Sequence, residues 1–217
     1  MPEIDHFLFA GSDLTLLSDI VRNHGLRAVT GGRHLDHGTH NALIGLESGC
    51  YLELIAPDPA GDPEGPRRKV IQGLATPQLL GWCLRVRGAD AFARRAEELG
   101  LSAKVVAGER STATGKLLRW QAIGVTGHGF GGVLPSFLDW LDTPHPTAEL
   151  AAQARLIALT LEHPDPQGLH DLLAALAGSP GVLPIKGVSC TKAQTPGLRA
   201  RFATPGGEFE LRGGGAT

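Results

Sequence analysis

The sequence predicts an α+β protein in which paired βαβββ modules form a concave mixed sheet, with a third, partial module at the C-terminus. One plan is repeated three times, at residues 4–26, 80–101 and 156–178: an apolar run, a turn, an amphipathic stretch and a glycine. After each copy come short runs rich in Val, Leu and Ile, separated by glycines, as in strands joined by tight connections. Because one such unit cannot bury the apolar face of its sheet alone, two copies must pack side by side.

The elements follow in order along the chain. In the first copy, IDHFLFAGSDL predicts a strand and a turn, TLLSDIVRNHGL predicts a helix, and the strands after it are LRAVTGG, HNALIGL and CYLELIAP. In the second copy, Gly100 ends a helix whose apolar face holds Phe92, Ala93, Ala96 and Leu99. In the third copy, Gly178 ends a helix whose apolar face holds Leu169, Leu172, Leu173 and Leu176.

These copies predict two domains. The first spans residues 1–142, with modules at 3–56 and 79–142 joined by a linker at 57–78 that is rich in proline and glycine. The second, residues 143–217, is a partial βαββ module that we interpret as a cover or an interface element.

Composition excludes several classes of partner and process. With 20 Lys and Arg against 22 Asp and Glu, and no block of like charge, neither nucleic acid nor an anionic membrane is an expected partner. The three cysteines, Cys50, Cys83 and Cys190, are far apart and fit reduced thiols in a cytoplasmic protein. The N-terminus carries acids where a signal peptide needs basic residues, and no apolar stretch is long enough to span a membrane.

The stretch GGRHLDHGTHN, residues 31–41, raises the question of a metal site because His34, His37 and His40 are spaced by three. Three histidines at this spacing share a face only on a helix, and the glycines of the stretch disfavour a helix. We therefore predict a loop in which these histidines have structural or rim positions.

Several motifs together resemble one known family: IDH, GGRHLDHGTHNAL, YLELIAPDP, ERSTATGKLLRW and PSFLDWL. Over residues 3–142 the chain resembles the glyoxalase-like domain family of the vicinal oxygen chelate superfamily. In that superfamily a divalent metal lies in the concavity between two modules, each of which donates ligands from its first and last strands. The resemblance implies His6 and Glu53 from the first module, and Trp82 and Asp139 from the second.

Trp82 cannot ligate a metal, because its indole offers only an N–H donor. The implied set is therefore His6, Glu53 and Asp139, which suits Mn, Mg, Ni or Zn, and the sequence leaves open whether any metal is bound. Strand alternation supports the acids, because Glu53 interrupts an otherwise apolar strand and a buried, unpaired carboxylate is costly. The alternative is that Glu53 pairs with an arginine and His6 is a core histidine.

The remaining candidate residues concern the substrate. Arg33, at the lip of the cup, has the planar fork that suits a carboxylate or phosphate, although it is equally explained as a solvated loop residue. Asn41 begins a strand beside Glu53, whereas Trp82 and Phe137 are candidates for filling the wall of the cup.

The leading hypothesis is a metal-dependent lyase or isomerase acting on a small oxygenated molecule, with Glu53 and Asp139 as the catalytic carboxylates. One alternative is a non-catalytic small-molecule-binding protein, which Trp82 at a ligand position favours. The other is a structural dimerisation module, and we expect a homodimer because paired modules can exchange between chains.

Overall fold

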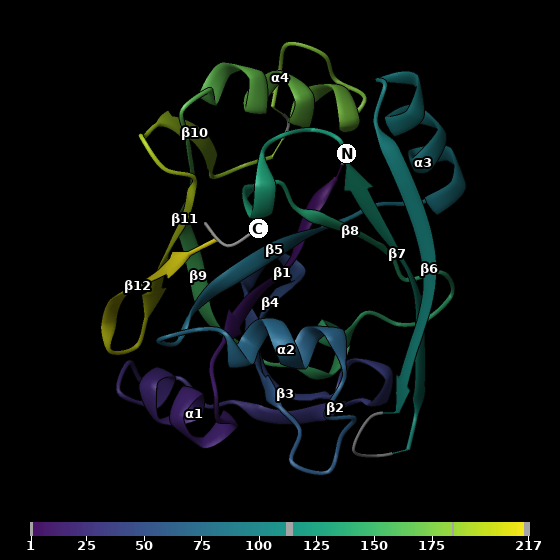
Figure 1. Cartoon of the computed structure of the whole chain (residues 1–217). Helices are drawn as coiled ribbons and strands as arrows, with labels where there is room; N and C mark the ends of the chain where they lie inside the picture. Colours follow the sequence, from purple (N-terminus) through teal and green to yellow (C-terminus); the bar gives the residue numbers. More distant parts are fainter. Residues whose placement is uncertain (1, 112–114, 184, 215–217) are drawn as a thin grey trace.

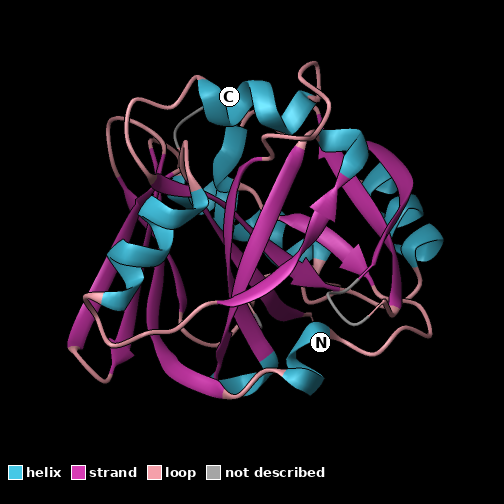
Figure 2. Ribbon diagram, turned by 90° about the horizontal axis from the view of Figure 1, so that it is seen from below, coloured by secondary structure: helices cyan, strands magenta, loops and turns pink. Residues whose placement is uncertain are grey.

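The computed structural model describes residues 2–111, 115–183 and 185–214 (Figure 1). Their strands form one mixed sheet of 12 strands, and the helices lie around it (Figure 2). The predicted α+β fold with a large mixed sheet is therefore confirmed.

The three copies of the repeated plan appear as three runs of elements. The first run is β1 (Glu3–Ala10), α1 (Leu14–Arg22), β2 (Val29–His34), β3 (Thr39–Leu46) and β4 (Cys50–Pro57). The second run is β5 (Gln78–Arg85), α3 (Ala89–Glu98), β6 (Ser102–Ser111), β7 (Leu117–Thr126) and β8 (Ser136–Asp139). The third run is β9 (Ala152–His163), α4 (Pro166–Leu176), β10 (Val188–Lys192), β11 (Gly197–Thr204) and β12 (Gly207–Gly213).

Strand β1 joins the first two modules. It pairs with β4 in parallel and with β5 in antiparallel fashion, so the first strands of both modules lie side by side. The edge strands β2 and β6 also contact each other, which brings the far ends of the two modules together. We call the face of the sheet that carries His6 and Glu53, between these strands of both modules, the cup.

The C-terminal module is hydrogen-bonded into the same sheet. Strand β9 pairs with β3, and β12 pairs with β5. Because β1 also pairs with β5, a closed ring runs through β1, β4, β3, β9, β11, β12 and back to β5. The predicted boundary between residues 142 and 143 stays a prediction, since the module beyond it continues both the sheet and its core.

Strand alternation separates two environments on β1 and β4. Phe7 and Leu52 point into the main core inside the ring, together with Phe202 from β11. Their neighbours His6 and Glu53 point to the other side, toward the cup. The ring therefore provides a rigid apolar backing for the polar residues of the cup.

Side-chain caps define the starts of two helices. Asp13 accepts a hydrogen bond from the backbone N–H of Leu16 at the start of α1. Asp165 accepts one from Gly168 at the start of α4, where Pro166 occupies the first turn. Such caps satisfy backbone donors that have no partner within the helix.

The predicted linker contains a helix that sequence reading missed. Helix α2 (Pro66–Gln72) begins at a proline and buries Ile71 against Ala10 and Ile55. The linker is thus packed over one end of the cup. Separately, no helix among the described residues has the length and apolar character needed to cross a membrane.

We predict that Phe202→Ala destabilises the whole chain by about 3–5 kcal/mol, because it leaves a cavity in the shared core. The Phe202 side chain is 1% exposed, and its ring meets that of Phe7 edge to face at 5.3 Å. Chemical denaturation measures the change. The neighbouring Arg201→Ala, at an exposed position, is the control and should cost less than about 1 kcal/mol. Equal effects of the two variants would contradict a core shared between the modules.

Candidate functional site

A buried carboxylate lies at the centre of the cup. Glu53, on β4, is 6% exposed, and its Oε1 accepts a hydrogen bond of 2.6 Å from Asn41 Nδ2 on β3. The Asn41 amide is itself fixed, because its Oδ1 accepts a hydrogen bond of 2.7 Å from the backbone N–H of Gly32. Glu53 is therefore held through one oxygen, while Oε2 faces the cup.

Beside Glu53 lies an imidazole that a second acid orients. His6 Nε2 is 3.4 Å from Glu53 Oε2, and His6 Nδ1 is 2.7 Å from Asp5 Oδ1. The His6 ring also stacks on Tyr51 at 4.8 Å. Asp5 and His6 both reach this region because the β1–β5 pairing shifts register between Ile4 and His6, and such bulges redirect side chains.

These contacts set the charges of the pair. Burial would lower the pKa of His6, but the adjacent Cys83 and the hydrogen-bonded Asp5 raise it well above its ordinary value. Burial would raise the pKa of Glu53, but His6, His34, Asn41 and Arg110 together lower it. His6 is thus an imidazolium and Glu53 a carboxylate at neutral pH.

Asp5 is completely buried and its carboxylate contacts three side chains. Besides His6, it accepts a hydrogen bond of 2.8 Å from Trp140 Nε1, and its Oδ2 lies 3.1 Å from His145 Nε2. Burial opposes its charge, but His145 and His6 keep the pKa of Asp5 far below its ordinary value. Asp5 therefore remains a carboxylate and links β1 to the segment that follows β8.

The structure revises part of the interpretation of the histidine stretch. His34 ends β2 and reaches the cup, where its Nε2 lies 3.9 Å from Glu53 Oε1 and its Nδ1 lies 3.1 Å from Thr39 Oγ1. Burial lowers the pKa of His34, and Glu53 only partly offsets this. Residues Leu35–His37 form a single 3₁₀ turn rather than a longer helix. The predicted loop is wrong for His34 and His40, which belong to β2 and β3, whereas a structural position for His34 agrees with its contacts to Glu53 and Thr39.

The assignment of Trp82 to the cup is wrong by one residue. Trp82 pairs with Phe7 across β1 and β5 and lies in the main core, where its Nε1 donates to the Val133 carbonyl at 3.0 Å. Cys83, which pairs with His6, faces the cup instead. A slip of one residue along a strand moves a side chain to the opposite face of the sheet.

The same slip occurs on β8. Leu138 lies with Leu8 and Cys83 on the cup side, whereas Phe137 packs in the main core against Phe92 with ring centroids 4.3 Å apart. Phe137 therefore does not line the cup as predicted.

Asp139 lies away from Glu53, at the start of α3. Its Oδ2 accepts hydrogen bonds from the backbone N–H groups of Gly88 at 2.7 Å and Ala89 at 3.2 Å, and its Oδ1 accepts one from Leu141 at 3.0 Å. Asp139 also borders a surface pocket of about 970 Å³ beside α3 and α4. The structure thus separates it from the pair that it was predicted to join, and its carboxylate stabilises the start of the helix.

Arg33 is engaged outside the cup. Its Nε donates to Asp58 Oδ2 at 2.5 Å, and half of its side chain is exposed. The prediction of Arg33 as an anion-binding residue does not fit this pairing, because Asp58 already supplies the anion.

The predicted divalent metal does not fit the donors that the cup offers. Of the implied set, His6 and Glu53 converge, but the cup-facing positions of the second module carry Cys83 and Leu138 instead of an oxygen donor. No three His, Cys, Asp or Glu side chains in the described part of the chain form a group suited to a metal ion. We therefore assign no step to a metal.

Sequence reading missed several residues of the site. Asp5 stood next to His6 in the quoted IDH motif, yet alternation placed it on the opposite face, because a bulge cannot be seen in a single strand sequence. Arg110 is 7% exposed and comes from β6, in the motif ERSTATGKLLRW, to which no site residue was assigned. His145 lies in the proline-rich segment after β8, where no periodic pattern marks it.

Paired βαβββ modules that join through their first strands around a polar cup define a protein of the vicinal oxygen chelate type. The sequence model of the glyoxalase-like domain family matches residues 4–177. The chain therefore belongs to the glyoxalase-like domain family. No curated protein matches the sequence.

Solved structures are similar to this chain in fold. A hypothetical protein from Staphylococcus aureus is 14% identical, with a TM-score of 0.68 over 98% of this chain and 85% of that one. A hypothetical protein from Bacillus halodurans C-125 is 19% identical, with a TM-score of 0.51 over 66% and 97%. A methylmalonyl-CoA epimerase from Mycobacterium tuberculosis is 24% identical, with a TM-score of 0.49 over 67% and 91%. The first likeness extends to the C-terminal module.

We predict that Asp139→Asn destabilises the protein by about 1–2 kcal/mol, because the amide cannot accept all the backbone hydrogen bonds that the carboxylate accepts. Chemical denaturation measures this loss. Asp142→Asn, the same chemical change at an exposed position, is the control and should have almost no effect. If Asp139→Asn left stability unchanged, the assignment of this residue to the start of α3 would be wrong.

Proposed function

We propose that the protein is an isomerase or lyase that moves a proton at a carbon next to a carbonyl group in a small oxygenated molecule. The single observation that carries this proposal is the buried pair of opposite charges in the cup, with Glu53 Oε2 3.4 Å from His6 Nε2. Both groups are oriented by further hydrogen bonds, from Asn41 to Glu53 and between Asp5 and His6.

In the proposed reaction Glu53 is the general base. Its Oε2, which Asn41 does not hold, accepts the proton from the carbon. As the C–H bond breaks, its electron pair moves toward the carbonyl oxygen, which becomes negative. The proton that Glu53 has taken is then returned to the same molecule, at the same or another carbon, or stays while a leaving group departs.

His6 stabilises the negative charge that develops in this step. Before the reaction its imidazolium faces the Glu53 carboxylate, and after proton transfer it faces the negative oxygen of the substrate. The positive charge therefore has a negative neighbour throughout, between side chains that are buried. Asp5 holds the ring in place and maintains its charge, so it is a positioning residue.

A second candidate function is binding without catalysis. Apolar residues on the floor of the cup favour it, since Leu8, Cys83 and Leu138 form a small cluster there with Trp120 beside it. Such a floor would suit an apolar ligand in a protein that only sequesters it. The homodimer expected from the sequence stays a prediction.

We predict that the protein catalyses the exchange of carbon-bound hydrogen for deuterium in small carbonyl compounds. Hydroxyacetone, pyruvate and related 2-hydroxy and 2-oxo compounds, incubated in deuterium oxide and followed by proton NMR, provide the assay. Glu53→Gln keeps the shape of the side chain but removes the base, so the enzyme-dependent rate should fall by about 10²- to 10⁴-fold.

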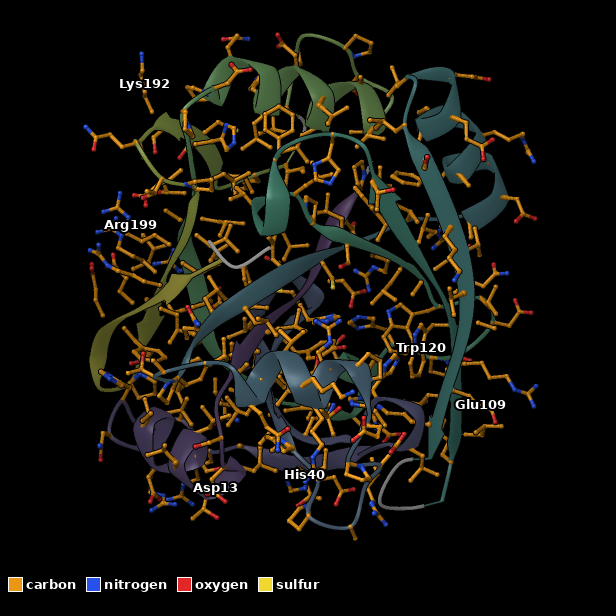
Figure 3. All side chains as sticks on the ribbon, viewed as in Figure 1. Asp13, His40, Glu109, Trp120, Lys192 and Arg199 are labelled. Carbon is orange, nitrogen blue, oxygen red and sulfur yellow. The ribbon has the colours of Figure 1, made fainter. Side chains whose placement is uncertain are left out.

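Glu109→Gln is the matched control for this assay. Glu109 is 65% exposed and points away from the cup, on the outer side of the β6–β7 hairpin (Figure 3). Its exchange rate should equal that of the unchanged protein. Exchange that persists in Glu53→Gln would contradict the assignment of the base, and binding of these compounds without any exchange would favour the second candidate function.

A further inference from the structure

Arg110 faces the same cup from the opposite side. In the β6–β7 hairpin it pairs directly with Leu118, and two residues earlier Gly108 pairs with Trp120. Directly opposed residues share a face of the sheet, and so do residues two positions apart on one strand. Trp120 packs against the cup floor, and Figure 3 shows it on the inner side of the hairpin, opposite Glu109. The side chain of Arg110 therefore points inward.

One nitrogen of the Arg110 guanidinium is buried without a hydrogen-bond partner. Arg110 is 7% exposed, and its Nη1 is fully enclosed but makes no hydrogen bond. Within the described ranges, no carboxylate lies at ion-pair distance from Arg110. Its positive charge nevertheless acts to lower the pKa values of Glu53, His34 and Tyr51. A buried arginine is ordinarily paired, because its charge loses the solvation that water provides. This unused donor makes Arg110 the candidate for binding an anion from outside the chain.

Two other arginines near the cup have partners. Arg33 pairs with Asp58, and Arg68 donates from Nη1 to the Asp58 carbonyl at 2.7 Å, although its Nε is also buried without a hydrogen-bond partner. Arg110 lies on β6, on the same side of the sheet as Glu53 and His6.

Charge balance indicates which anion would fit. The buried Glu53 carboxylate faces the same cup, so each negative charge that enters is repelled by it. A carboxylate adds one charge and matches the planar fork of a guanidinium with two parallel hydrogen bonds. A phosphate would add close to two charges in front of a single guanidinium.

We propose that Arg110 binds a carboxylate group of the substrate, so that the substrate is a small carboxylic acid whose reacting carbon is presented to Glu53 and His6. The orienting role rests on the proposed function, but the binding of a carboxylate does not. Arg110 and Glu53 belong to different modules, so a molecule that contacts both would be fixed across the cup at two points. Neutral carbonyl compounds would lack the contact with Arg110.

The test measures binding separately from exchange. Calorimetric titration with a panel of small 2-oxo and 2-hydroxy acids, including pyruvate and lactate, is compared with titration of the corresponding neutral amides. The acids should bind and the amides should bind at least about tenfold more weakly, because they cannot form the charge-assisted pair. Arg110→Met, which keeps much of the length and apolar volume, should lose about 10- to 100-fold in affinity for the acids. Arg119→Met, on the outer face of the same hairpin, should bind as the unchanged protein does.

The thermal stability of the ligand-free variants is a second measurement. Because Arg110 is buried and unpartnered, Arg110→Met should melt at the same temperature as the unchanged protein or higher, so that lost binding cannot be ascribed to unfolding. Glu53→Gln should bind the acids as tightly or more tightly, because a like charge has been removed from the cup. Should Arg110→Met fail to fold, Arg110→Lys, which keeps the charge but loses the fork, should bind the acids more weakly than the unchanged protein.

Several outcomes would overturn the proposal: no acid binds, the amides bind as well as the acids, inorganic phosphate binds more tightly than every acid, or Arg110→Met binds the acids normally. Binding of acids that depends on Arg110, without any exchange, would support this inference and refute the proposed function. Exchange of hydroxyacetone as fast as that of pyruvate, with no affinity for acids, would support the proposed function and refute this inference.

Discussion

The carboxylate of Asp5 is the constraint on which the site depends. A fully buried, ionised carboxylate is stable only if donors surround it, and His6, His145 and Trp140 fill this role. The same contacts hold the His6 ring in one orientation and favour its positive charge, which in turn keeps Glu53 ionised. The charge of each acid is thus maintained by the imidazole between them.

The fold makes this arrangement rigid. His6 lies on β1, the strand that both modules share as a neighbour, and Glu53 lies on the adjacent β4. The C-terminal module closes a ring of strands behind them, so the face opposite the cup packs against a continuous apolar core. The site is therefore supported by the whole chain rather than by its first two modules alone.

The sequence predicted those features that follow from local pattern. The repeated plan predicted the modules. The single acid in an otherwise apolar strand predicted that Glu53 faces a polar partner, with Asn41 beside it. The sequence did not predict features that depend on strand register or on contacts between distant segments. A slip of one residue exchanged Trp82 for Cys83 and placed Asp139 in the cup. Arg110 approaches Glu53 only because β6 meets β2, a contact that no pattern within either segment specifies.

The most direct test of this account is the charge of His6 in the folded protein. A pH titration of isotopically labelled histidine side chains by NMR, assigned with a His6→Gln variant, measures it. We predict that the pKa of His6 lies well above its ordinary value of 6.5, and that Asp5→Asn lowers it because Cys83 then remains as the raising partner without the Asp5 charge. A neutral His6 ring at pH 6.5 and above would contradict the account, since Glu53 would then lack the positive partner on which the proposed chemistry depends.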